Sequence, residues 1–150
     1  MGEVKIQDYT HLYSGVNNNE RAAGGVGFLF HEDLAPVIKG CKFVSNRIMV
    51  LDILEGDRVQ SVMVAYGPNK SAVSEEKDTF FNDLQREVDD CEGIPIVLGH
   101  LYGRVGCSYR RWPETIERYG KEFLNDNGER IISFCMPNDL VITNTLFPHE

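Results

Sequence analysis

The chain has 150 residues, of which 42% are hydrophobic and 25% charged, and its formal net charge is -8. This composition is typical of one soluble globular domain and excludes collagen-like, low-complexity and disordered chains. The acidic balance excludes a protein that coats nucleic acid non-specifically, because such binding needs many Lys and Arg contacts to phosphates. A local basic groove, or a divalent metal that bridges an acidic site to a phosphate, stays compatible with it.

No apolar stretch is long enough to span a membrane, and the first residues lack the basic start and apolar core of a signal peptide. We therefore expect a nuclear or cytoplasmic protein that is not secreted. The cysteines and histidines are scattered without the spacing of a zinc site, so we expect reduced thiols and no zinc. These residues are Cys41, Cys91, Cys107 and Cys135, and His11, His31, His100 and His149.

The first half of the chain is rich in predicted strands. Aromatic and β-branched runs bounded by Gly, Pro and polar residues indicate them. A polar connection is expected at 17–21, a turn or short irregular piece with Pro36 at 34–40, and a hairpin turn at 55–57. The four strands are expected at residues 9–13, 25–30, 47–54 and 59–66.

The second half alternates helices with strands. Residues 74–90 predict a helix that Ser74 can cap, with acidic residues in its first turn and an apolar stripe. Residues 126–135 predict a second helix, with capping-box spacing between Asp126 and Glu129. Together with the earlier strands, these elements predict an α/β sandwich with a mixed sheet. Strands are also expected at 94–99 and 140–143, with a long loop at 106–124.

Polar side chains follow the strands expected at 59–66 and 94–99, where open sheets place their chemistry. His100 and Tyr102 are two residues apart, so in an extended chain both project to the same side. Tyr66 and Asn69 stand at the end of the other strand, where Gly-Pro turns the chain. These four residues are the candidates for a catalytic site.

The loop after the strand at 94–99 interleaves cations and aromatic rings. Arg104, Arg110, Arg111 and Trp112 are the residue types that contact phosphates and stack on bases. They are the candidate nucleic-acid-binding residues. The alternative is a solvated loop in which Trp112-Pro113 packs on the domain.

Several motifs in order resemble the endonuclease/exonuclease/phosphatase superfamily. Within it, the chain is most similar to endonuclease domains of non-LTR retrotransposons and to craniofacial development protein 2-like sequences. The resemblance covers nearly the whole chain and is specific only in combination. Its main segments are Tyr66-Gly67-Pro68-Asn69, the helix at 74–90, Ile96-Val97-Leu98-Gly99, Asn127-Gly128-Glu129-Arg130 and residues 139–147. Ser14-Gly15, Arg21, Gly25-Val26-Gly27 and Ser45-Asn46-Arg47-Ile48 also match.

The resemblance implies a magnesium-dependent phosphodiesterase of the apurinic/apyrimidinic type with a four-layer α/β sandwich like that of deoxyribonuclease I. Tyr66 and Asn69 match the family tyrosine and amide that approach the scissile phosphate. The family pattern after the central strand is Gly-Asp-x-Asn, whose Asp activates water and whose Asn holds a phosphate oxygen. In this chain His100 and Tyr102 replace both side chains.

The family's first strand lies before residue 1, and its metal-associated Asp and final Asp-His pair lie beyond residue 150. We therefore expect residues 1–150 to be a partial domain with an incomplete magnesium site and unpaired sheet edges. Three functions follow as hypotheses. The chain is an inactive, degenerate endonuclease fragment of retrotransposon origin, a non-enzymatic domain that binds nucleic acid or protein, or a phosphatase for small phosphate esters.

Overall fold

The computed structural model describes residues 1–16 and 24–148, so the polar connection expected at 17–21 lies outside the described residues. The chain divides into two compact units. The first comprises Met1–Gly67 and Arg86–His100, and the second comprises Pro68–Gln85 and Leu101–Glu150.

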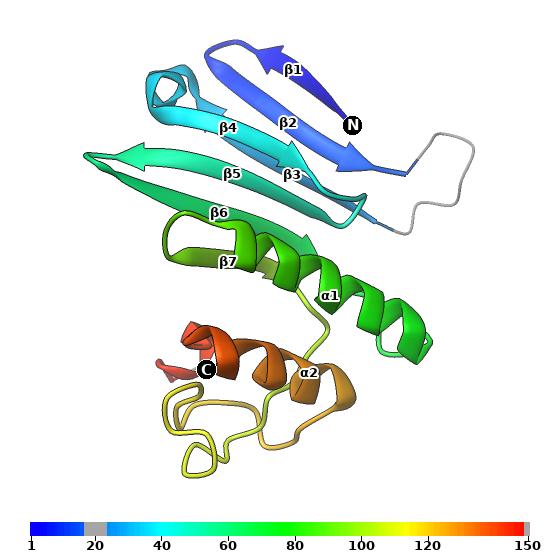
Figure 1. Ribbon diagram of the computed structural model, residues 1–150. Coiled ribbons are helices and arrows are strands. Elements are labelled where there is room, and N and C mark those ends of the chain that lie inside the picture. The colour runs from blue at the N-terminus through cyan, green and yellow to red at the C-terminus, as the bar shows by residue number, and fades with distance from the viewer. Residues whose placement is uncertain (17–23, 149–150) are drawn as a thin grey trace. The chain divides into compact units, whose positions relative to one another are not determined.

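A three-stranded antiparallel sheet opens the first unit, in the order β1-β2-β3 (Figure 1). It consists of β1 (Gly2–Ile6), β2 (Tyr9–Gly15) and β3 (Gly25–His31). The predictions of β2 and β3 are confirmed, whereas β1 was not predicted. In its sequence, Gly-Glu-Val-Lys-Ile, the apolar residues Val4 and Ile6 are exposed. The strand forms through its pairing with β2.

A second sheet of four strands has the order β4-β5-β6-β7. The first three strands are antiparallel and β7 is parallel to β6, so the predicted mixed sheet is confirmed. The hairpin turn between β5 and β6 is also confirmed, with Gly56 at φ 61. The strands are β4 (Ile38–Phe43), β5 (Ile48–Glu55), β6 (Arg58–Tyr66) and β7 (Pro95–His100).

The turn predicted at 34–40 is replaced in the structure by a 3-10 helix η1 (Glu32–Val37) followed by β4. Pro36 just before the strand and Gly40 within it interrupt the apolar pattern, so periodicity alone does not reveal β4. The pairing of β4 with β5 accommodates this interruption through a shift of register between Ile38 and Gly40. The strand is therefore a product of pairing, not of local preference.

Apolar side chains from both sheets form the core of the first unit. Leu12, Met49 and Leu51 are buried at its centre, and partly buried side chains from β3, β4, β5 and β6 pack against them. Along β5 four successive residues from Ile48 to Leu51 are buried, which explains its unbroken apolar run. Each such side chain contributes roughly 1.5–3 kcal/mol to folding.

The helix α1 (Ser74–Asp90) has the predicted bounds and connects β6 to its parallel neighbour β7. Phe80 and Leu84 of its apolar stripe are buried, as the pattern predicts. Ser74 is the first residue of the helix, and its hydroxyl accepts a hydrogen bond from Arg130. Residues 74–85 of α1 belong to the second unit.

The second unit also contains α2 (Asp126–Cys135), again with the predicted bounds, and the short 3-10 helices η2 (Met136–Asn138) and η3 (Thr143–Thr145). Phe81 of α1 and Phe134 of α2 lie with ring centroids 6.2 Å apart. The predicted capping box is wrong in register, because Asn125 is the N-cap and its side chain accepts from Gly128 N. Asp126 therefore stands inside the first turn.

The strand predicted at 140–143 is wrong. Leu140 N donates to Cys135 O and Ile142 N donates to Thr115 O, so these amides bond to a helix end and a loop. The chain then turns into η3. The β-branched composition of this stretch favours a strand, but no ladder partner lies beside it in the described part of the chain.

The long loop predicted at 106–124 is confirmed as irregular structure. An isolated bridge between Val105 and Leu124 closes it, and Ile116 is buried inside it. Tyr119 N donates to Thr145 O, which ties the loop to η3. Within the described residues, no helix is long and apolar enough to cross a membrane.

Candidate functional site

In the first unit, Tyr66 and His100 are the last residues of β6 and β7 and stand opposite each other in the parallel register. Their ring centroids lie 6.3 Å apart, and Gly67 N donates to His100 O over 2.9 Å. The structure therefore brings these two predicted residues together at the carboxyl end of adjacent parallel strands. This is the edge at which open sheets place ligands.

Arg47, just before β5, is a residue of this cluster that the sequence argument did not select. Its Nη1 atom donates to Tyr66 O and Gly67 O, each over 3.3 Å, and its guanidinium lies 5.9 Å from the centre of the Tyr66 ring. Tyr66 N in turn donates to Arg47 O over 2.9 Å. Arg47 thus fixes the point at which the chain leaves β6. Its position as the one cation before a fully apolar run was the available signal.

The chain does not stay extended from His100 to Tyr102, so the condition under which both side chains would project to the same side is not met. Tyr102 has φ 51, in the left-handed region, so the alternation of side chains along a strand ends at His100. Gly99, at φ 140, already departs from ordinary strand geometry. His100 belongs to the first unit and Tyr102 to the second.

Asn69, in the second unit, shapes the loop after β6. Its Oδ1 atom accepts hydrogen bonds from the backbone amide and the hydroxyl of Ser71, each over 2.9 Å. This is an Asx turn, in which a side chain takes the place of a backbone acceptor. The amide oxygen of this predicted site residue is therefore engaged within its own loop.

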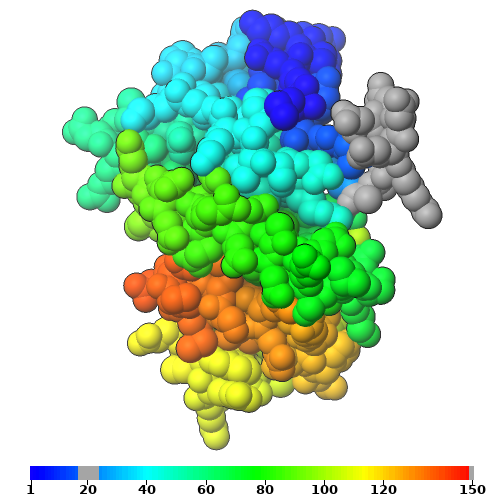
Figure 2. Space-filling model, turned by 45° about the vertical axis from the view of Figure 1, so that its right-hand side comes forward, coloured from blue at the N-terminus to red at the C-terminus, as the bar shows by residue number. Residues whose placement is uncertain are grey.

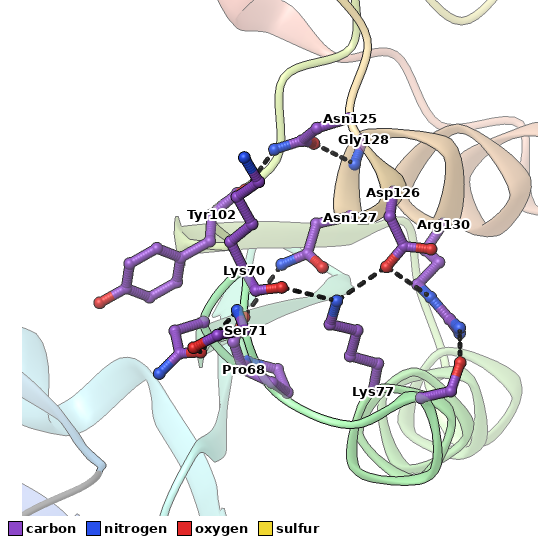
Figure 3. A network of polar contacts seen from close by, with 12 residues as sticks. Pro68, Lys70, Ser71, Lys77, Tyr102, Asn125, Asp126, Asn127, Gly128 and Arg130 are labelled. Atoms are coloured by element: carbon purple, nitrogen blue, oxygen red, sulfur yellow. Dashed lines mark hydrogen bonds and ion pairs between the residues drawn. The ribbon is translucent and has the colours of Figure 1, made fainter.

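Asn125 joins the start of α2 to the loop after β7 (Figure 3). Its Oδ1 accepts from Gly128 N over 2.8 Å and from Arg104 N over 2.9 Å, while its Nδ2 donates to Tyr102 O over 3.1 Å. One side chain thus caps a helix and holds two backbone groups of residues 101–104. The ring of Tyr102 points away from this network in Figure 3.

Asn127 makes a second connection from the same helical turn. Its side chain is 2% exposed, and its Nδ2 donates to Pro68 O over 2.9 Å and to Leu101 O over 3.2 Å. The loops that follow β6 and β7 are therefore both bonded to one asparagine. In the sequence, Asn127 stands out only as part of a motif, and the run of three polar residues at 125–127 is the further signal that marks it.

Close backbone approach accompanies these bonds. A Cβ atom added to Gly128 would lie 1.9 Å from Arg104 O, and one added to Gly103 would lie 2.1 Å from the Cδ1 atom of Ile131. Residues 101–104 therefore lie directly against the first turns of α2, with no room for a side chain at Gly128 and room at Gly103 only where the Ile131 side chain moves.

An ion-pair network ties α1 to α2 within the second unit. The ammonium group of Lys77, whose residue is 5% exposed, donates to Asp126 Oδ2 over 2.8 Å and to Lys70 O over 3.1 Å. Arg130 bonds Asp126 and Asp78. The hydrogen bond from Lys77, together with the charges of Lys77 and Arg130, lowers the pKa of Asp126 below its ordinary value.

The basic loop, residues 104–124, carries five Arg and Lys against three Glu, whereas the whole chain is acidic. The guanidinium of Arg104 lies 4.3 Å from the ring centre of Phe123, and that of Arg111 lies 4.7 Å from that of Trp112. The guanidinium carbon of Arg110 lies 5.9 Å from the ring centre of Tyr109. Residues of this loop are open to view at the surface of their unit (yellow in Figure 2).

The predicted binding residues lie on one loop but do not form a single cluster, because Arg104 and Arg111 contact different rings. Phe123 is 52% exposed beneath Arg104, and the arginines themselves are exposed. Trp112 is partly buried, which agrees in part with the alternative that it packs on the domain. The loop therefore presents cations already stacked on rings, with their charged faces in solvent.

The resemblance implies magnesium, and the described residues, 1–16 and 24–148, gather no cluster of three metal-ligating His, Cys, Asp or Glu side chains. At the positions where the resemblance implies Asp and Asn, the chain offers the imidazole of His100 and the phenol of Tyr102. Neither group is one of the carboxylate or carbonyl oxygens that magnesium prefers, and neither supplies the carboxylate that the resemblance implies for activating water.

Comparison with known proteins finds no family model that matches the chain. Craniofacial development protein 2 of Bos taurus is 30% identical over 149 residues, which are 98% of this chain and 24% of that protein. Craniofacial development protein 2 of Tragulus javanicus is 29% identical over 149 residues, 98% of this chain and 25% of that protein. The chain is therefore homologous to these proteins along nearly its whole length and spans about a quarter of theirs.

Proposed function

We propose that the chain belongs to a degenerate domain of the endonuclease/exonuclease/phosphatase type, derived from a retrotransposon endonuclease and inactive as a nuclease. One observation carries this proposal. The carboxyl end of the parallel pair β6 and β7, where such a domain would hold its water-activating carboxylate, presents His100 beside Tyr66. The four-layer sandwich of that superfamily is part of the proposal.

The replacement is large enough to abolish measurable turnover. Loss of a positioned general base costs on the order of a hundredfold to ten-thousandfold in rate, and loss of a donor that stabilises developing charge adds a similar factor. A neutral imidazole accepts a proton but carries no negative charge for a metal ion.

The test is nicking of supercoiled DNA in magnesium or manganese. The unmodified chain is compared with a His100→Asp, Tyr102→Asn double variant. We expect no nicking by the unmodified chain. Metal-dependent nicking that survives repurification and disappears in a His100→Ala variant would overturn the proposal, because it would make His100 the working base.

A second function, nucleic-acid binding, is favoured by the basic loop. Its arginines are stacked on aromatic rings while their charges face solvent, an arrangement that suits phosphate contact and base stacking. Binding through this loop requires neither a metal ion nor the residues at the end of β7. It is therefore compatible with an inactive nuclease site.

Trp112 is the chain's only tryptophan, so its fluorescence reports on this loop directly. We expect single-stranded DNA to quench it at low salt, with an affinity that falls as salt rises. Arg110→Ala plus Arg111→Ala should abolish the response, whereas the charge-matched pair Lys5→Ala plus Arg58→Ala should leave it intact. The absence of any response at low salt contradicts this function.

A further inference from the structure

The loop at 101–104 adopts a conformation that its own sequence does not favour. Tyr102 has φ 51, a left-handed backbone that costs an ordinary L-residue free energy because its Cβ approaches the following carbonyl oxygen. Asn and Gly visit this region readily, whereas a bulky aromatic residue does so only when its surroundings impose it. Something outside the loop must therefore hold Tyr102 in place.

The side chain of Asn125 is placed to do so. Its Nδ2 donates to the carbonyl of Tyr102 and its Oδ1 accepts from the amide of Arg104, so it grips the peptide groups on either side of Gly103. Both bonds come from one planar amide, which fixes the orientation of the intervening backbone as well as its distance. Asn127 adds a bond to Leu101 O at the start of the same loop.

Helix capping alone does not account for this pattern. An N-cap needs one acceptor for an amide of the first turn, which Ser, Thr or Asp supplies as well as Asn. Asn125 uses Oδ1 for that purpose with Gly128 N and still reaches the loop with both ends of its amide. Only a side chain with an acceptor and a donor at this length makes all three bonds.

We propose that Asn125 is a positioning residue, which holds Tyr102 in the left-handed conformation and so sets the direction in which the side chain at position 102 projects. The inference rests on the proposed function in one respect, namely that position 102 is a site position. The contact itself is independent of any catalysis or nucleic-acid binding. In Figure 3 the result is a Tyr102 ring directed away from α2.

Three variants separate this role from capping. Asn125→Ser keeps an acceptor for Gly128 N but is too short to reach the loop. Asn125→Asp keeps the acceptor for Gly128 N and for Arg104 N but removes the donor to Tyr102 O. Asn125→Ala removes all three bonds, and the two cap-preserving variants keep the test interpretable where Ala fails to fold.

The readouts are amide hydrogen exchange and the backbone scalar coupling of Tyr102, measured by NMR on the full chain. We expect exchange at Arg104 to rise roughly tenfold in Asn125→Ser and to stay unchanged in Asn125→Asp, since a single hydrogen bond contributes about that factor. Exchange at Gly128 should stay slow in both. The left-handed signature of Tyr102 should be lost in both, because both lack the donor.

A left-handed Tyr102 in both the Ser and Asp variants would overturn the proposal, because the loop would then hold its own shape. The same samples are titrated with single-stranded DNA. An absence of DNA binding contradicts the binding function and leaves the NMR result intact. The two failures are therefore distinguishable.

Discussion

Tyr102 is the residue at which backbone and side chain are least well matched. Its left-handed backbone is a conformation that Gly adopts without cost and that other L-residues adopt at roughly 1 kcal/mol or more. The mismatch is stabilised by the bonds from Asn125. Substitutions at position 102 should therefore report on φ as well as on the lost ring.

We expect Tyr102→Gly to be more stable than Tyr102→Ala by about 1 kcal/mol, because both remove the ring but only Gly fits the left-handed region. At an ordinary position the order is reversed. Urea unfolding of both variants measures the difference. The same pair of substitutions at exposed Tyr119, which has negative φ, serves as the control and should favour Ala.

A second prediction at the scale of single residues concerns Gly128. Replacing Gly by Ala inside a helix usually stabilises it by up to about 1 kcal/mol. Here the added Cβ would lie 1.9 Å from Arg104 O, so Gly128→Ala should destabilise by about 2 kcal/mol or more. Gly40→Ala, which meets nothing within 4 Å, should change the free energy of unfolding little. Equal effects of the two substitutions would contradict the close approach.

At the scale of elements, the start of α2 is held to α1 by Asp126, which accepts from Lys77 and Arg130. The pKa of Asp126 is lowered, first by the hydrogen bond from Lys77. A group with a depressed folded pKa stabilises the fold above its unfolded pKa and loses that contribution as pH falls through the folded value. The stabilisation is thus present at neutral pH and lost in acid.

Asp126→Asn should therefore be less stable than the unmodified chain at pH 7, with the difference closing as the pH falls below its ordinary pKa of 3.8. Thermal unfolding at a series of pH values measures it. Glu129→Gln removes a carboxylate from the same helical turn that the described contacts leave outside the Lys77 network, so it is the matched control. A stability difference between Asp126→Asn and the unmodified chain that stays constant across pH would contradict the role of the Asp126 charge.

The strongly periodic elements were predictable from the sequence, and the paired ones were not. The α1 and α2 helices follow from apolar stripes and polar starts, and β5 follows from an unbroken apolar run. In contrast, β1 and β4 lack a clear pattern and form by pairing with the strand that follows each of them in the chain. A β-branched stretch at 140–143 found no partner and did not become a strand.

The residues of the candidate site also differ in how far the sequence predicts them. Tyr66 and His100 were predictable because a strand-helix-strand order favours parallel neighbours, whose carboxyl ends lie at the same edge of the sheet. Arg47 and Asn125 act through backbone carbonyls and amides, so their residue types mark them as polar but do not show which backbone groups they contact. The left-handed turn at Tyr102 was unpredictable for a related reason, since tyrosine disfavours it.

At the scale of the whole molecule, the four cysteine thiols are divided between the two units. Burial raises the pKa of Cys135 to about 12, whereas Cys107 is exposed. Burial also raises the pKa of Cys41 and of Cys91, which are both partly buried. The thiolate is the reactive form, so reactivity should follow exposure and pKa together.

We expect iodoacetamide at pH 8 to label Cys107 first, Cys41 and Cys91 more slowly, and Cys135 only after unfolding. Peptide mass spectrometry over time gives the four rates. In about 8 M urea, which unfolds most proteins, the four labelling rates should converge. This control separates the effect of the fold from that of the local sequence. Labelling of Cys135 as fast as Cys107 in the folded protein would contradict its burial.

The grip of Asn125 on the loop bears on how such a chain drifts over evolutionary time. Because the hydrogen bonds join backbone groups, they constrain the path of the chain at position 102 and leave its side chain almost unconstrained. A site residue can then be exchanged by mutation without loss of the fold around it.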